Sequence, residues 1–186
     1  MTQLDAFVQS GPEGFTYQAN AITEDEEQRL LQQIPALPFK AFEFRGFEGK
    51  RRVVSYGWRY DFNQQKLQSA DPIPPFLVPV RELAARFAGL RPDQLEQVSV
   101  IEYSPGSAIG WHRDRPMFGD VVGISLLSPT RFRFRRKAGN AWERAAVVVE
   151  PRSMYLLRGP SRDDWEHSIP PVGDLRYSIT LRTFRG

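Results

Sequence analysis

The stretch that decides the fold is Leu175-Arg176-Tyr177-Ser178-Ile179-Thr180-Leu181-Arg182-Thr183-Phe184. Its odd-numbered positions are mostly apolar, and its even-numbered positions carry two arginines with hydroxyl side chains between them. Because successive side chains on a strand point to opposite faces, this pattern predicts a β-strand with one apolar face and one cationic face. An ordinary strand with its polar face in water is the alternative that the pattern alone leaves open.

This strand is the last of a series. Seven further strand-like runs precede it, separated by turn residues, at about 97–103, 108–113, 121–127, 130–136, 142–150, 153–157 and 164–168. Eight short strands with no helices between them argue against a parallel α/β sheet. They favour a mainly β (α+β) protein in which two sheets form a jelly roll.

The first half of the chain is predicted to be partly helical. Thr23 and Glu26 form a capping box, in which each side chain satisfies a free amide at the start of a helix. A second helix is predicted over about 78–88, with Gly89 placed to end it. Residues 41–63 are rich in aromatic and β-branched residues and predict strands or a hairpin.

Composition narrows the class of protein. The 186 residues are 41% hydrophobic and 12% aromatic, which suits one compact domain with a full core. No apolar run approaches the ~20 residues of a membrane span, and the first residues do not resemble a signal peptide. The absence of cysteine excludes disulfides and thiolate metal sites and fits a cytoplasmic protein. The formal net charge of +3 permits an anionic partner.

A metal site is predicted from the only two histidines, His112 and His167. Residues two apart on a strand point the same way, so His112 and Asp114 can bind one ion. With His167 they would form the facial triad of two histidines and one carboxylate that non-haem iron(II) oxygenases use. A surface histidine beside a surface aspartate is the alternative interpretation of the His-x-Asp triplet by itself.

A dicarboxylate site is predicted beside that metal. Arg176 and Arg182 offer the bidentate fork that a carboxylate needs, and the hydroxyls of Ser178 and Thr180 lie between them. The two arginines lie up to ~20 Å apart along an extended strand, so we expect one to bind the distal carboxylate and the other to order the site. Tyr103, before a Pro-Gly turn, is a further donor or else a core tyrosine.

Together these segments resemble the AlkB-like dioxygenases. The matching stretches are Tyr103-Ser104-Pro105-Gly106, His112-Arg113-Asp114, Trp165-Glu166-His167-Ser168-Ile169-Pro170 and Arg176-Tyr177-Ser178-Ile179-Thr180-Leu181-Arg182. Their order and approximate spacing fit, and the similarity covers about residues 97–184. Two arginines separated by five residues are the most specific element.

The resemblance implies a double-stranded β-helix, with residues 1–96 forming N-terminal helices and a substrate lid and residues 97–186 the catalytic core of one domain. It implies iron(II) bound by His112, Asp114 and His167, with 2-oxoglutarate as co-substrate bound by Tyr103, Arg176, Ser178 and Arg182, and dioxygen as oxidant. Oxidation of an N-methyl group would then release formaldehyde.

Two positions depart from the family pattern. Ile101 stands where many members have an asparagine on the same strand face as Tyr103, so one co-substrate hydrogen bond is expected to be missing or replaced. Pro116 stands where the bacterial repair enzyme has an acidic residue near the damaged base. The second departure bears on the substrate more than on the chemistry.

Basic and aromatic residues alternate in the expected lid between Lys50 and Phe62. Tyr56, Trp58 and Tyr60 are expected to share one strand face that stacks on a nucleobase, while the basic run 50–52, with Arg51 as the candidate contact, meets phosphates. A core-facing aromatic strand with a solvated basic end is the alternative.

A second basic run combines Arg131, Arg133 and Arg135 with Phe132 and Phe134. The phenylalanines are expected to pack inward, which leaves an arginine ridge that could follow a nucleic-acid backbone or simply be solvated.

The leading hypothesis is a monomeric oxidative demethylase of alkylated nucleobases in DNA or RNA. A dioxygenase acting on a protein or small molecule is the second hypothesis. A non-catalytic, basic nucleic-acid-binding module is the third.

Overall fold

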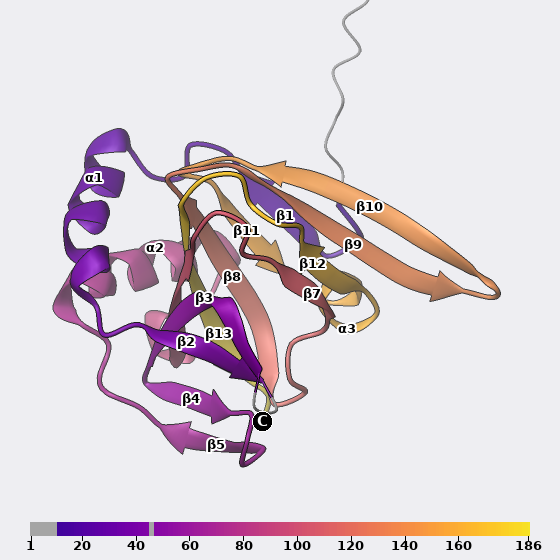
Figure 1. The fold of residues 1–186 in the computed structure, drawn as a ribbon, viewed down its shortest axis with the longest axis horizontal. Coiled ribbons are helices and arrows are strands. Elements are labelled where there is room, and N and C mark those ends of the chain that lie inside the picture. The colour runs from indigo at the N-terminus through magenta and orange to yellow at the C-terminus, as the bar shows by residue number, and fades with distance from the viewer. Residues whose placement is uncertain (1–10, 45–46) are drawn as a thin grey trace, which may run out of the picture.

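Two antiparallel β-sheets stack on one another, and two helices cover the outside of the larger sheet (Figure 1). The computed structural model describes residues 11–44 and 47–186. Within these ranges the chain is mainly β with helices near its start, so the predicted fold class and jelly-roll arrangement are confirmed.

The larger sheet has seven strands in the described part of the chain, in the order β1-β11-β8-β13-β6-β3-β2. In that order their bounds are Phe15–Gln18, Met154–Leu157, Phe118–Leu126, Arg176–Phe184, Gln97–Tyr103, Phe47–Tyr56 and Lys40–Phe44. The smaller sheet has the order β10-β9-β12-β7, with bounds Ala141–Val149, Thr130–Ala138, Glu166–Ile169 and Ile109–His112. A separate two-stranded sheet pairs β4 (Trp58–Asp61) with β5 (Lys66–Ser69).

The two main helices begin and end at the residues that the sequence indicates. Helix α1 (Glu24–Gln33) starts with the predicted capping box, in which the Thr23 hydroxyl accepts from the Glu26 amide at 3.1 Å. Helix α2 (Val78–Ala88) ends where Gly89 adopts a left-handed conformation, with φ of 66°. The short helix α3 (Pro160–Asp163) and the 3₁₀ turns Ile34–Ala36, Pro75–Leu77 and Pro92–Gln94 were not predicted.

The larger sheet separates two hydrophobic cores. On one face, the apolar side chains of β13, β8 and β6 pack against α1 and α2, with Ile179 and Leu181 of β13 almost fully buried. On the other face, Tyr103 and Val121 pack with Phe134 and other residues of the smaller sheet. The polar face of β13 therefore points between the two sheets and not into water.

Close approach between β8 and β11 requires a glycine. Tyr155 on β11 lies directly opposite Gly123 on β8, and a Cβ added at Gly123 would overlap the tyrosine ring. The Tyr155 ring fills the space between the sheets, against Phe15 and Phe132.

The eight predicted strands in the second half are all present, most with ends shifted by only one or two residues. Strand β8 begins three residues earlier than expected, at Phe118. The region 41–63 contains strands as expected, but it divides between two sheets because Gly57, with φ of 74°, separates β3 from β4. None of the helices in the described ranges has both the length and the apolar character needed to cross a membrane.

Candidate metal centre

The two histidines meet because their strands are paired. His112 is the last residue of β7, and it lies directly opposite His167 on β12 in the smaller sheet. Both rings are on the inward face, with their centroids 4.3 Å apart. Asp114 follows just after β7, and one ligand atom from each of the three residues lies within 4.8 Å of the others. The predicted convergence of the triad is therefore found.

Hydrogen bonds and burial prepare these side chains for a cation. The Nδ1 atom of His112 lies 2.8 Å from the Gly110 carbonyl oxygen, to which it donates, so Nε2 is the ring nitrogen left facing Asp114. Burial lowers the pKa of His167 to about 3, with a smaller lowering from the neighbouring His112 ring, and this keeps the His167 imidazole neutral. Burial alone would raise the pKa of Asp114, but Arg182 and the two histidines outweigh it and hold the pKa well below its ordinary value.

Arg182 holds the aspartate in place. Its Nε atom donates to Asp114 Oδ2 at 2.5 Å, and its Nη1 atom donates to Gln97 at 2.8 Å. The other oxygen, Oδ1, is left facing the Nε2 atoms of His112 and His167, at 3.7 and 3.6 Å. Of the two arginines, Arg182 is thus the one that orders the site, and two of its nitrogens are already engaged before any co-substrate contact.

Arg176 lies at the other end of β13 and has donors that are not satisfied. The residue is fully buried, its Nε atom donates to Ser125 at 3.2 Å, and its guanidinium lies 4.8 Å from the centre of the Tyr103 ring. Among the described residues, its Nη1 and Nη2 atoms are buried without a hydrogen-bond partner. A buried guanidinium is stable only when a partner compensates it, so this site fits a bound carboxylate. Ser178 is buried on the same strand face.

The aromatic residues of the expected lid divide between two sheets. Tyr56, Trp58 and Tyr60 do not share a strand face, which corrects that prediction: Tyr56 ends β3 and is buried in the helix-facing core, whereas the other two belong to β4. Trp58 packs edge-on against Phe184, with ring centres 5.9 Å apart. The guanidinium of Arg115, next to Asp114 of the triad, stacks 4.6 Å from the Tyr60 ring.

The basic run at positions 50–52 does not form one surface, because alternate residues of β3 point to opposite faces. Arg51 turns inward, donates to the Ala108 carbonyl at 3.0 Å and stacks on Phe42, and its burial lowers its pKa. Arg52 points the other way and forms a two-bond ion pair with Glu102. The run therefore does not present one continuous cationic surface, and contact of Arg51 with phosphate stays a prediction.

Ile101 and Pro116 lie where the sequence places them. Ile101 packs against the same core cluster as Tyr103, in agreement with their shared strand face. Pro116 is exposed in the turn that follows Asp114.

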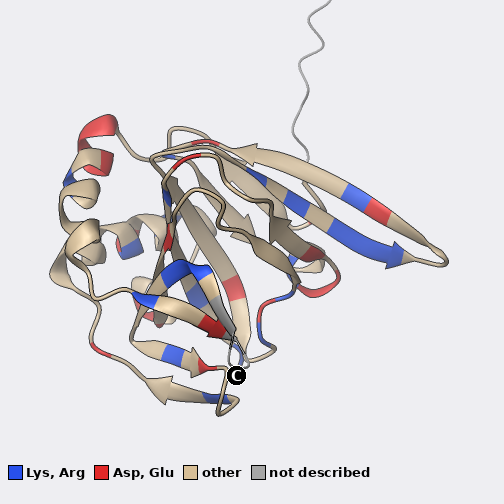
Figure 2. Cartoon of the chain, in the orientation of Figure 1, with Lys and Arg blue, Asp and Glu red and all other residues tan. Residues whose placement is uncertain are grey.

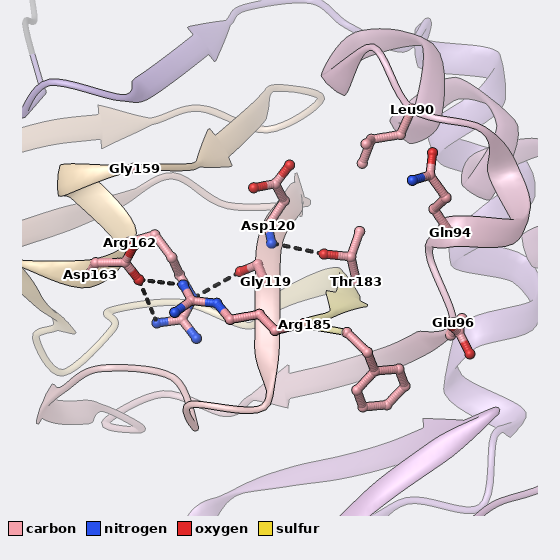
Figure 3. Close-up of a pocket in the computed structure, with 11 residues that line it drawn as sticks. Leu90, Gln94, Glu96, Gly119, Asp120, Gly159, Arg162, Asp163, Thr183 and Arg185 are labelled. Atoms are coloured by element: carbon pink, nitrogen blue, oxygen red, sulfur yellow. Dashed lines mark hydrogen bonds and ion pairs between the residues drawn. The ribbon is translucent and has the colours of Figure 1, made fainter.

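Sequence reasoning missed Arg162, which braces the loop carrying Asp114. This buried side chain on α3 donates to the carbonyl oxygens of Arg115, Phe118 and Gly119 at 2.7–2.9 Å. Figure 3 shows it beside Gly119, in the wall of a hollow of about 510 Å³ that does not include the triad. Ser125 and Gln97 were also missed, since each acts through an arginine on β13.

The comparison with protein families agrees with this geometry. A model of the 2OG-Fe(II) oxygenase superfamily matches residues 14–182. The chain belongs to this superfamily. Members use iron(II), 2-oxoglutarate and dioxygen, and the triad of this oxygenase fits the metal, as the unpaired Arg176 donors fit a diacid.

This oxygenase is similar to several proteins named as AlkB homologues. It is 28% identical to the "Alkylated DNA repair protein ALKBH8 homolog" of Arabidopsis thaliana over 80% of this chain and 48% of the relative. It is 29% identical to "Alpha-ketoglutarate-dependent dioxygenase alkB homolog 7, mitochondrial" of Mus musculus, over 80% and 63% of the two chains. The chain therefore spans about half to two thirds of the length of these relatives.

A solved structure shares the fold of this oxygenase. The structure titled "The structure of OsALKBH1" superposes with a TM-score of 0.72 at 14% identity, over 94% of this chain and all of that one. This likeness shows the double-stranded β-helix fold of the oxygenase.

Proposed function

We propose that the protein is an iron(II)- and 2-oxoglutarate-dependent dioxygenase that removes alkyl groups oxidatively from nucleobases in DNA or RNA. The observation that carries the chemistry is the buried guanidinium of Arg176, with two unpaired donors, on the strand that also holds the metal aspartate through Arg182. A cation site next to a binding site for a buried diacid is the arrangement that this reaction needs.

Each residue has a defined part in this proposal. His112, Asp114 and His167 would hold the metal on one side and leave its other side open. When bound, iron(II) and 2-oxoglutarate supply the oxidative decarboxylation that activates dioxygen to hydroxylate a C–H bond. Arg176 binds and orients the far carboxylate of the diacid. The surrounding core of aromatic residues keeps water out of the space between the sheets.

The proposed substrate class rests on the cluster beside the metal loop. The Tyr60 and Phe62 rings pack edge to face with centres 5.0 Å apart, and the Arg115 guanidinium lies 4.6 and 5.2 Å from them. Aromatic rings and arginine planes are the groups on which an unstacked base rests. The name of the Arabidopsis relative, which refers to repair of alkylated DNA, supports the same class.

The test is turnover of 2-oxoglutarate and release of formaldehyde with methylated DNA and RNA oligonucleotides, in parallel with methylated peptides. We expect stimulation by at least one oligonucleotide and no turnover in the Asp114→Ala variant. Stimulation by peptides alone would favour the second hypothesis, a protein-directed dioxygenase. Iron-independent function retained in Asp114→Ala would favour the third, a non-catalytic binding module.

A further inference from the structure

The outer face of the smaller sheet carries a dense row of cations. Because β9 alternates, Phe132 and Phe134 point inward and are buried, as predicted, while the arginines between them point outward. In the pairing of β10 with β9, Trp142 lies opposite Lys137 and Arg144 lies opposite Arg135, so both point to the same outer face. We call this surface the cationic face, and it consists of Arg131, Arg133, Arg135, Lys137, Trp142 and Arg144.

Little negative charge compensates the cationic face. Glu166 pairs with Arg135 at 2.6 Å, whereas Glu143 pairs with Arg136 on the reverse side of the hairpin. Across the described ranges, the exposed side chains of Arg131, Lys137 and Arg144 have no carboxylate partner. Five cations against one carboxylate give this face a net charge of +4, which exceeds the +3 of the whole chain.

Two tryptophan rings contact three of the five cations. The guanidinium groups of Arg133 and Arg135 lie 5.1 and 4.6 Å from the Trp111 ring centre. Arg135 and Lys137 lie 4.4 and 5.2 Å from the ring of Trp142, which is 40% exposed. A cation held over an aromatic ring keeps its charge toward solvent and loses less conformational entropy when it binds an anion.

The shape of this region suits an extended partner. Figure 1 shows the hairpin of β9 and β10 projecting well beyond the rest of the molecule, and Figure 2 shows basic residues recurring along β9. Alternate residues on a strand recur about every 6.7 Å, so the row from Arg131 to Lys137 is about 20 Å long. A chain of regularly spaced negative charges matches a row of this length, whereas a compact ligand does not need one.

We propose that the cationic face binds the phosphate backbone of a nucleic-acid strand. The inference rests on the proposed function for the identity of the strand, which would be the substrate nucleic acid. The exposed indole ring of Trp142 among the cations favours a strand with accessible bases over a purely acidic protein surface. His167 points inward from β12 while Glu166 points outward from it, so the cationic face and the metal centre lie on opposite sides of one sheet. Contacts on this face would hold the strand without entering the catalytic space.

The test measures binding of an unmodified, fluorescein-labelled single-stranded oligonucleotide by anisotropy at several salt concentrations. The triple variant Arg131→Gln, Lys137→Gln and Arg144→Gln removes the three unpaired cations and no residue of the metal or co-substrate site. Each cation–phosphate pairing removed from a single strand lowers the slope of log affinity against log salt by ~0.7, so the slope should fall by about 2. Affinity at 0.1 M salt should fall on the order of 100-fold.

A matched control removes the same charge from the helical side of the molecule. The variant Arg29→Gln, Arg86→Gln and Arg91→Gln changes three exposed arginines and should keep the wild-type slope. Equal losses in the two variants, or wild-type binding by the first, would overturn the inference. So would wild-type protein that binds anionic lipid vesicles or acidic peptides but no oligonucleotide.

The outcome for this face is separable from the outcome for the proposed function. Binding that depends on the cationic face, without turnover of any methylated base, would support the surface and contradict the demethylase. Turnover of a methylated oligonucleotide at an unchanged KM in the first triple variant would support the demethylase and contradict the surface.

Discussion

Replacing Arg176 with methionine should make the ligand-free protein more stable while it weakens binding of 2-oxoglutarate about 100-fold. The guanidinium is fully buried, and two of its nitrogens have no partner among the described residues. Each unsatisfied buried donor costs about 1–3 kcal/mol, and methionine fills a similar volume without polar atoms. Removal of the bond to Ser125 and of the stacking on Tyr103 offsets about 2 kcal/mol of this gain. The free energy of unfolding should therefore rise by about 2 kcal/mol.

The assay is thermal and urea unfolding with and without 2-oxoglutarate, using manganese(II) to prevent turnover. At a ligand concentration 100 times Kd, binding stabilises the wild type by about 2.7 kcal/mol. For a chain of this length that raises Tm by about 5–11 °C. Arg176→Met should start from a higher Tm and show no such rise.

A second buried arginine provides the matched control. All the contacts of Arg162 are made within the protein, because it donates to three backbone carbonyls. Arg162→Met should therefore destabilise the fold by about 4.5–9 kcal/mol, since each of the three bonds from a charged donor contributes about 1.5–3 kcal/mol. A stability loss of similar size in both variants, or a ligand-induced rise in Tm retained in Arg176→Met, would refute the reasoning.

Three further perturbations test the framework of the site. Gly123→Ala should lower the free energy of unfolding by about 2 kcal/mol in urea titrations, because the added methyl overlaps the buried Tyr155 ring; an unchanged midpoint would contradict that packing. Arg182→Met should weaken manganese(II) binding by about 10–100-fold in calorimetry, because Asp114 loses the donor that orients it, and unchanged affinity would argue against this role. The hydrogen bond from Arg52 on β3 lowers the pKa of Glu102. The stabilisation that this carboxylate contributes is therefore complete above the ordinary glutamate pKa of about 4.3, and it is lost as pH falls through the lower pKa of the folded state. Glu102→Gln should flatten the acid limb of stability against pH, and a limb identical to that of the wild type would exclude this contribution.

The sequence was sufficient for the two main helices and the eight strands of the second half because these follow from local patterns, whereas β1, β5 and α3 were not predicted. Alternation along 175–184 predicts a strand, and a capping box and a terminal glycine set the ends of the two helices. With only two histidines in the chain, His112 and His167 had to be the imidazole ligands of any such site.

Other features depend on contacts between segments that are far apart in the sequence. The alternation of apolar and polar residues along one strand does not predict such contacts. The strand pattern gives Arg176 and Arg182 equivalent positions. Only their neighbours, Ser125 for Arg176 and Asp114 for Arg182, distinguish the proposed co-substrate arginine from the arginine that positions Asp114. The prediction that Tyr56, Trp58 and Tyr60 share one strand face is wrong because the left-handed backbone at Gly57 ends β3. The sequence pattern does not reveal this break.

The most direct test of the central claim is the visible charge-transfer absorption that iron(II) gives when it chelates a 2-keto acid without oxygen. The triad and Arg176 together predict a band that saturates at one equivalent of iron in the wild type. They predict its loss in Asp114→Ala and His167→Ala, and its appearance in Arg176→Met only at about 100-fold higher 2-oxoglutarate, a change of ~2.7 kcal/mol for the missing carboxylate pairing. A band of wild-type strength in either triad variant, or unchanged 2-oxoglutarate affinity in Arg176→Met, would contradict the account.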